Sequence, residues 1–106
     1  MKHLLLISLM LPLSAFSARA DDYMMKIKNH QFQPSELVVP SGIKFKLVIE
    51  NQDSTPEEFD SHILNREKII AGNSTATIYI GPLAPGRYPF IGEFNEATAK
   101  GVIVAQ

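Results

Sequence analysis

Side chains able to bind a cation are concentrated in one short segment of this chain. Four of them lie within six consecutive positions: Glu57, Glu58, Asp60 and His62. Because alternate residues of a strand share a face, Glu58, Asp60 and His62 are expected to point together if the segment is extended. Carboxylate oxygens and imidazole nitrogens suit iron, manganese or calcium and retain copper(I) poorly. The segment is therefore a candidate metal site; the alternatives are a solvated acidic loop and a surface histidine.

The first twenty residues have the pattern of a cleaved export signal. Lys2 precedes an apolar stretch that runs from Leu4 to Phe16, and Ala18-Arg19-Ala20 supplies the small residues at which signal peptidase cuts. A membrane anchor, the alternative, needs about 20 apolar residues, whereas this stretch has thirteen positions. We therefore predict a signal peptide at residues 1–20, one exported domain at residues 21–106, a periplasmic location, and no membrane span after cleavage.

The exported part carries a small negative charge and no cysteine. All eleven acidic residues lie after residue 20, whereas Lys2 and Arg19 lie within the predicted signal, so eight of the ten basic residues remain and the formal charge becomes −3. This charge disfavours nucleic acid and anionic membranes as partners. Without cysteine, the domain forms neither a disulfide nor a metal thiolate, so packing must stabilise it.

The rest of the chain has the pattern of short β-strands separated by glycine, proline, asparagine and aspartate. Residues 43–49 alternate apolar and polar side chains, which predicts a strand with one buried face. Similar runs lie at residues 25–28, 37–39, 77–80, 88–91 and 102–104. We therefore predict an all-β fold, a single Greek-key β-sandwich of six to eight strands. Residues 59–68 have a weak helical alternative.

The last part of the chain has the frame of a copper-binding loop. Gly86-Arg87-Tyr88-Pro89-Phe90 leads into a loop that closes on Lys100-Gly101-Val102-Ile103-Val104. This frame resembles the cupredoxin family, in which a Cys, a His and a Met of the loop bind copper. The resemblance assigns those three places to Gly92, Asn95 and Ala99. Because a blue-copper centre needs the thiolate, the imidazole and the thioether, we expect the cupredoxin fold without type 1 copper.

The earlier half of the exported part extends the resemblance. Phe32-Gln33-Pro34, a short strand and the turn at Gly42 are similar to the first half of a bacterial cupredoxin. The place of the first copper-binding His falls on Glu58. His30, in the Phe-x-Pro turn region, is expected to lie far from the copper loop.

Three further segments give a narrower resemblance, to the EfeO-type periplasmic cupredoxin-like domains linked to iron uptake. They are Glu58-Phe59-Asp60-Ser61, Leu64-Asn65-Arg66-Glu67-Lys68 and Gly92-Glu93-Phe94. The cupredoxin fold would place the acidic segment around Glu58 beside the loop that holds Glu93 and Glu96. The resemblance therefore implies carboxylates from both segments at one metal site, with Asn95 standing where these relatives commonly carry a His.

These observations predict a non-enzymatic accessory protein in periplasmic metal handling, with iron as the metal and a membrane iron permease or a periplasmic oxidase as the partner. No catalytic triad, phosphate loop or pair of catalytic acids is recognisable by spacing. Glu58 and Glu93 are the primary candidate metal ligands; the secondary candidates are Glu57, Asp60, His62 and Glu96. Two alternatives stay open: a metal-free docking domain that uses the loop at residues 91–98, and an electron-transfer protein with copper in an unusual environment of Glu, Asn and His.

Overall fold

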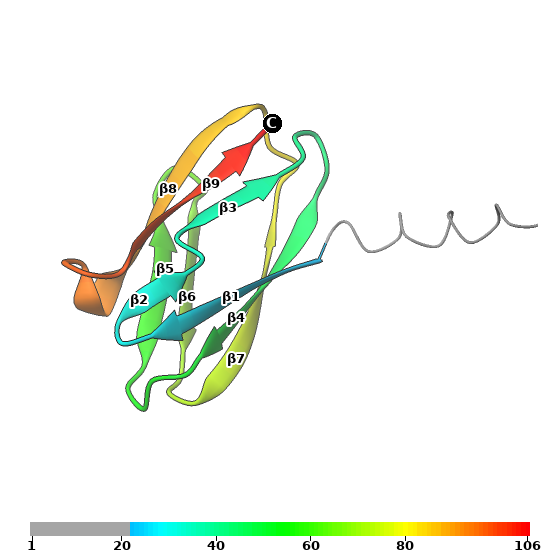
Figure 1. Cartoon of the computed structure of the whole chain (residues 1–106). Helices are drawn as coiled ribbons and strands as arrows, with labels where there is room; N and C mark the ends of the chain where they lie inside the picture. The colour runs from blue at the N-terminus through cyan, green and yellow to red at the C-terminus, as the bar shows by residue number, and fades with distance from the viewer. Residues whose placement is uncertain (1–21) are drawn as a thin grey trace, which may run out of the picture.

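Residues 22–106, which the computed structural model describes, form nine β-strands and one short 3-10 helix (Figure 1). The strands are β1 (Asp22–Lys28), β2 (Gln31–Gln33), β3 (Glu36–Val39), β4 (Phe45–Asn51), β5 (Glu57–Ser61), β6 (Arg66–Ile70), β7 (Ser74–Ile80), β8 (Gly86–Gly92) and β9 (Lys100–Ala105). The 3-10 helix, η2 (Glu93–Asn95), lies between β8 and β9. None of the described residues forms a helix long and apolar enough to cross a bilayer. The predicted signal peptide lies outside the described residues and stays a prediction.

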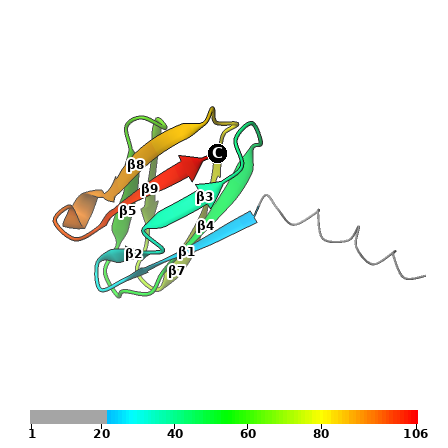
Figure 2. The ribbon, with the colours of Figure 1, turned by 45° about the horizontal axis from the view of Figure 1, so that its top comes forward.

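The strands are arranged in two sheets. One sheet has the order β2-β1-β4-β7 and the other the order β3-β9-β8-β5-β6. The chain crosses between the layers because consecutive strands such as β3 and β4 lie in different sheets. Figure 2 shows β3, β9 and β8 side by side, with η2 at one end of the sandwich. The all-β sandwich is therefore confirmed, with nine strands because the three-residue β2 and the polar β5–β6 segment also pair.

The space between the sheets is filled by apolar side chains. The alternation in residues 43–49 is confirmed, since β4 buries every second side chain, namely Phe45, Leu47 and Ile49. Phe59 and Phe90 stack with their ring centroids 4.8 Å apart, and the ring of Phe32 meets that of Phe90 edge-on at 4.9 Å. Aromatic pairs of this kind add roughly 0.5–1.5 kcal/mol to the stability gained from buried area. This aromatic group fixes the positions of β5 and β8, which carry the candidate site.

The β5–β6 segment is a hairpin, so the helical alternative for residues 59–68 is wrong. β5 pairs antiparallel with β6 on one side and with β8 on the other, where Phe59 lies opposite Gly92. Asn65, in the turn, has a φ of 55°, a left-handed conformation that asparagine tolerates. Strand pairing on both sides of β5 outweighs the weak helical tendency of a short polar segment.

Polar contacts join the loops at the η2 end of the sandwich. Asn29 and His30 form the β1–β2 turn with φ values of 54° and 59°, and the Asp53 carboxylate accepts hydrogen bonds from their N–H groups at 2.8 and 2.9 Å. The bond from His30 is the main reason that the pKa of Asp53 lies below its ordinary value. The Thr98 hydroxyl donates to the His30 carbonyl at 2.7 Å. His30 therefore contacts the β8–β9 loop, and the expectation that it lies far from this loop is wrong.

Candidate functional site

One carboxylate is buried at the η2 end of the sandwich. Glu57 begins β5, whose side chains alternate between the interior and the exterior, and only 1% of its surface is exposed. Glu57 Oε1 accepts hydrogen bonds from the N–H of Glu58 at 2.9 Å and from the N–H of Phe94 at 2.8 Å. Glu57 Oε2 accepts a hydrogen bond from Asn95 Nδ2 at 2.8 Å. The carboxylate therefore joins β5 to η2.

Gly92 leaves the space that this carboxylate occupies. A Cβ atom on Gly92 would lie 2.7 Å from Cδ of Glu57 and 2.6 Å from Cβ of Ala99, which is closer than carbon atoms approach without displacement. The Gly92 N–H donates to the Ala99 carbonyl at 2.8 Å, and the Ala99 N–H donates to the Asn95 carbonyl at 2.8 Å. These contacts make neighbours of four residues: Glu57, Gly92, Asn95 and Ala99.

Other carboxylates lie on the opposite, outer face of β5. Glu58 and Asp60 are half-buried there, and Glu93 is exposed at the start of η2. The pKa of Glu93 is raised, first by a hydrogen bond with the Asp60 side chain and then by burial and by neighbouring acidic charges. The pKa of Glu58 is raised, first by burial and then by the charge of Glu67 and other acids. The outer face therefore concentrates negative charge.

A mostly apolar hollow lies beside these acids. It has a volume of about 230 Å³ and is lined by Asp60, His62, Pro89, Phe90 and Ile91. Asp60 lies opposite Ile91 in the β5–β8 pairing, which places a carboxylate next to an aliphatic side chain. Sequence reasoning missed this hollow. Its signal was the apolar character of Pro89 and Ile91, which flank the buried Phe90 and so point outward.

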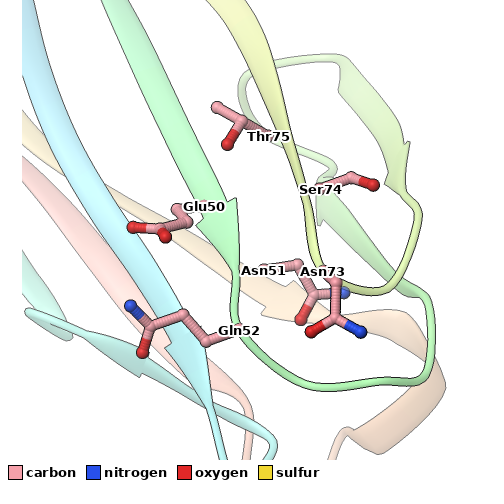
Figure 3. A pocket seen from close by; sticks show the side chains of 6 residues that line it. All are labelled: Glu50, Asn51, Gln52, Asn73, Ser74 and Thr75. Carbon is pink, nitrogen blue, oxygen red and sulfur yellow. The ribbon is translucent and has the colours of Figure 1, made fainter.

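A second hollow of about 230 Å³ lies near the end of β4 and the start of β7 (Figure 3). Its lining is polar and consists of Glu50, Asn51, Gln52, Asn73, Ser74 and Thr75. Asn51 is 1% exposed, and its Nδ2 donates to three backbone carbonyls at 2.9 to 3.3 Å. Its Oδ1 accepts a hydrogen bond from the Asp53 N–H at 3.0 Å. The buried amide in this hollow is therefore fully used in joining loops.

A sequence profile described as the cupredoxin-like domain matches residues 2–105 of the chain. The protein belongs to the cupredoxin-like domain family. The two-sheet architecture and the position of η2 between β8 and β9 agree with this assignment.

Known proteins resemble this cupredoxin-like chain in sequence or in fold. An uncharacterised protein of Rickettsia prowazekii (strain Madrid E) is 45% identical over 78 residues, which is 74% of this chain and 62% of that relative, so the match spans less than two thirds of its length. Auracyanin A, a blue copper protein of Chloroflexus aurantiacus, has a TM-score of 0.70 at 16% identity, covering 80% of this chain and 98% of auracyanin. A chain of a heme-copper terminal oxidase dimer has a TM-score of 0.67 at 14% identity. The match covers 86% of this chain and 68% of the oxidase chain. At these identities the two structures establish the fold alone.

Three copper positions that the family resemblance implies lie together in this cupredoxin-like domain, but without copper-binding side chains. They are Gly92, Asn95 and Ala99, in place of Cys, His and Met. A glycine, a neutral amide and a methyl group do not supply the thiolate, imidazole and thioether of a type 1 centre. Because Glu57 already fills the space beside Gly92, the residues present do not fit type 1 copper.

Glu57, and not Glu58, is the acidic residue of β5 that lies beside Gly92, and the assignment of the first His place to Glu58 stays a prediction. Phe59 lies opposite Gly92, and Glu57 shares the inner face of β5 with Phe59. Glu58 lies between them in sequence and therefore points outward.

The six predicted metal ligands divide between different surroundings. Glu57 faces the interior, His62 is exposed in the β5–β6 turn, and the other four contribute to the outer acidic face: Glu58, Asp60, Glu93 and Glu96. Within residues 22–106, no three His, Cys, Asp or Glu side chains are placed to hold a metal ion. Metal binding by Glu58 and Glu93 stays a prediction.

Proposed function

We propose that this protein is an exported, non-enzymatic accessory of the periplasm that acts by binding a partner protein through the outer face of β5 and β8. The observation that carries the proposal is the apolar hollow beside Ile91 with acidic side chains around it. The interior carboxylate of Glu57 accepts its hydrogen bonds from within the chain. The acidic side chains that could bind a partner therefore lie on the outer face.

The outer face suits a partner that presents basic groups next to an apolar side chain. Asp60 lies opposite Ile91, and Glu58 lies opposite Ile69, of which 60% is exposed. Such a mixture of apolar surface and one sign of charge steers a partner of opposite charge and buries area once it arrives. The kinds of partner proposed are a membrane iron permease, as the EfeO-type resemblance implies, or a periplasmic oxidase.

The test is site-specific photo-crosslinking in the periplasm. A crosslinker at position 91 is expected to give a defined product, and the charge reversal Asp60→Lys is expected to abolish it. The matched control is Tyr79, which is 58% exposed on the other sheet and should give no such product. The same product from position 79, or a product at position 91 that survives Asp60→Lys, would contradict docking through this face.

The outer carboxylates favour a second candidate, reversible capture of iron for uptake. Burial and acidic neighbours raise the pKa of Glu58, and a hydrogen bond with Asp60, followed by burial and acidic neighbours, raises the pKa of Glu93. A bound hard cation would offset the negative charge gathered there. Calorimetric titration with ferrous, ferric and manganese ions should then show saturable iron binding that Glu58→Ala and Glu93→Ala both abolish. Absence of binding would remove the iron role and leave the docking role unaffected.

A further inference from the structure

We infer that the Glu57 carboxylate takes the place of a metal ion at the η2 end of the sandwich and holds the β8–β9 loop in position without any cofactor. This inference does not depend on the partner or on the outer face. It concerns the inner positions, where the family frame and the residues present disagree.

The Glu57 carboxylate lies among the implied copper positions. It occupies the space that a Cβ on Gly92 would need, beside Ala99, and it accepts a hydrogen bond from Asn95. A metal ion bound by side chains at positions 92, 95 and 99 would need the same volume. The carboxylate group therefore occupies the space in which such an ion would lie.

The hydrogen bonds of Glu57 join two segments of the chain. An ionised carboxylate accepts hydrogen bonds and donates none, and Glu57 is the acceptor in each of its three hydrogen bonds. Two of these donors, the Phe94 N–H and the Asn95 amide, belong to η2 and lie 37 and 38 positions along the chain. One central group thus joins β5 to the loop, which is what a metal bound by both segments would do.

The buried polar side chains at this end have their hydrogen-bond partners. Among residues 22–106, no buried side-chain nitrogen or oxygen lacks a hydrogen-bond partner. The loop is also closed on itself by the Gly92 and Ala99 backbone bonds. Because no buried side-chain donor or acceptor among these residues is left over, the arrangement needs no ion to satisfy it.

The experiment is amide hydrogen exchange measured by NMR on the wild-type protein and on Glu57→Met, with Glu58→Met as the adjacent outward control. Methionine is similar in length to glutamate but has no carboxylate oxygen to accept the three hydrogen bonds, so exchange at the Phe94 amide should rise about tenfold to a hundredfold. The control should change this exchange by less than about threefold. Treatment of the wild-type protein with EDTA, or addition of zinc(II), should leave it unchanged.

Two results would overturn the inference. One is faster Phe94 exchange in the wild-type protein after EDTA treatment with recovery on adding metal, which would show that an ion orders the loop. The other is equal exchange in Glu57→Met and Glu58→Met. If Glu57→Met does not fold, Asn95→Ala removes one of the three bonds, and its Phe94 exchange should lie between those of the control and of the wild-type protein in denaturant. Wild-type exchange in Asn95→Ala would count against the inference.

Discussion

Glu57 and Glu58 are adjacent in the sequence and have opposite surroundings. Glu57 faces the interior, where three donors bind its oxygens. Glu58 faces outward, where burial and acidic neighbours raise its pKa. The alternation of β5, and not the residue type, creates this difference. One carboxylate stabilises the end of the sandwich, and the other adds to the negative charge offered to a partner.

The comparison shows why a family's sequence frame does not determine the chemistry of a site. A buried carboxylate is tolerated only where donors replace its lost water, and in this domain the β8–β9 loop supplies them. On the outer face water remains, so carboxylates can gather there without donors. The predictions below test the inner and the outer carboxylates separately.

The largest effect is expected from Glu57→Ala. Removal of the carboxylate leaves the Phe94 N–H and the Asn95 amide without their acceptor in a partly buried region, which should lower the free energy of unfolding by about 3 kcal/mol. Urea unfolding measures this loss. Glu58→Ala is the matched control and should cause no loss, because it relieves repulsion on the outer face; similar losses in the two variants would remove the distinction between the faces.

A somewhat smaller loss is expected from Asn51→Leu, which tests whether interior polar groups in general carry stability at this end. The Asn51 amide binds three carbonyls and the Asp53 N–H, and leucine has a similar size but none of these bonds. The free energy of unfolding should fall by about 2 kcal/mol. An unchanged urea midpoint would show that these interior bonds contribute no net stability.

Asp53→Asn should alter the pH dependence of the free energy of unfolding. The pKa of Asp53 is lowered from 3.8. Its contribution to the free energy of unfolding is therefore complete above pH 3.8 and disappears as the pH falls through the lowered pKa. The variant should be less stable than the wild-type protein at pH 7 and should lose less on acidification. Thermal unfolding at pH 7 and in steps below pH 4 measures both; parallel curves would contradict the proposed role.

Glu93→Gln should have the smallest effect and the opposite sign. The pKa of Glu93 is raised from 4.5. Its favourable contribution to the free energy of unfolding is therefore complete below pH 4.5 and is lost as the pH rises through the raised pKa. The variant should therefore unfold at a slightly higher temperature at pH 7, and the difference should shrink in high salt, which screens exposed charges. A lower unfolding temperature at pH 7 would mean that Glu93 is stabilising when charged.

The fold could be predicted because its signals are local. The alternation in residues 43–49 and the spacing of turn residues indicate a β-sandwich without knowledge of any distant contact. The β5–β6 hairpin could not be predicted in this way, since Glu58, Asp60 and Glu67 make the segment polar on its outward face. Its identity as a strand depends on pairing with β8, about thirty positions away.

The site could be predicted only in part, for a related reason. In β5, Glu57 shares the inner face with Phe59 and Glu58 faces outward, whereas the sequence alone made Glu58 a primary candidate. A shift of one residue in the strand register exchanges the inner and outer faces. Because burial of a carboxylate without hydrogen-bond donors is unfavourable, a buried Glu57 could not be predicted while its donors were unknown. Those donors, at Phe94 and Asn95, become neighbours of Glu57 only in the folded chain.

The most direct test of the central claim is an NMR titration of the wild-type protein with the diamagnetic ions zinc(II) and copper(I), observed at the amides of Gly92, Asn95 and Ala99. We predict that these three signals do not shift saturably, and that any changes are confined to the outer face around Glu58, Asp60 and Glu93. Saturable shifts at Gly92, Asn95 and Ala99 would show that an ion enters the inner positions, and would contradict the assignment of that place to the Glu57 carboxylate.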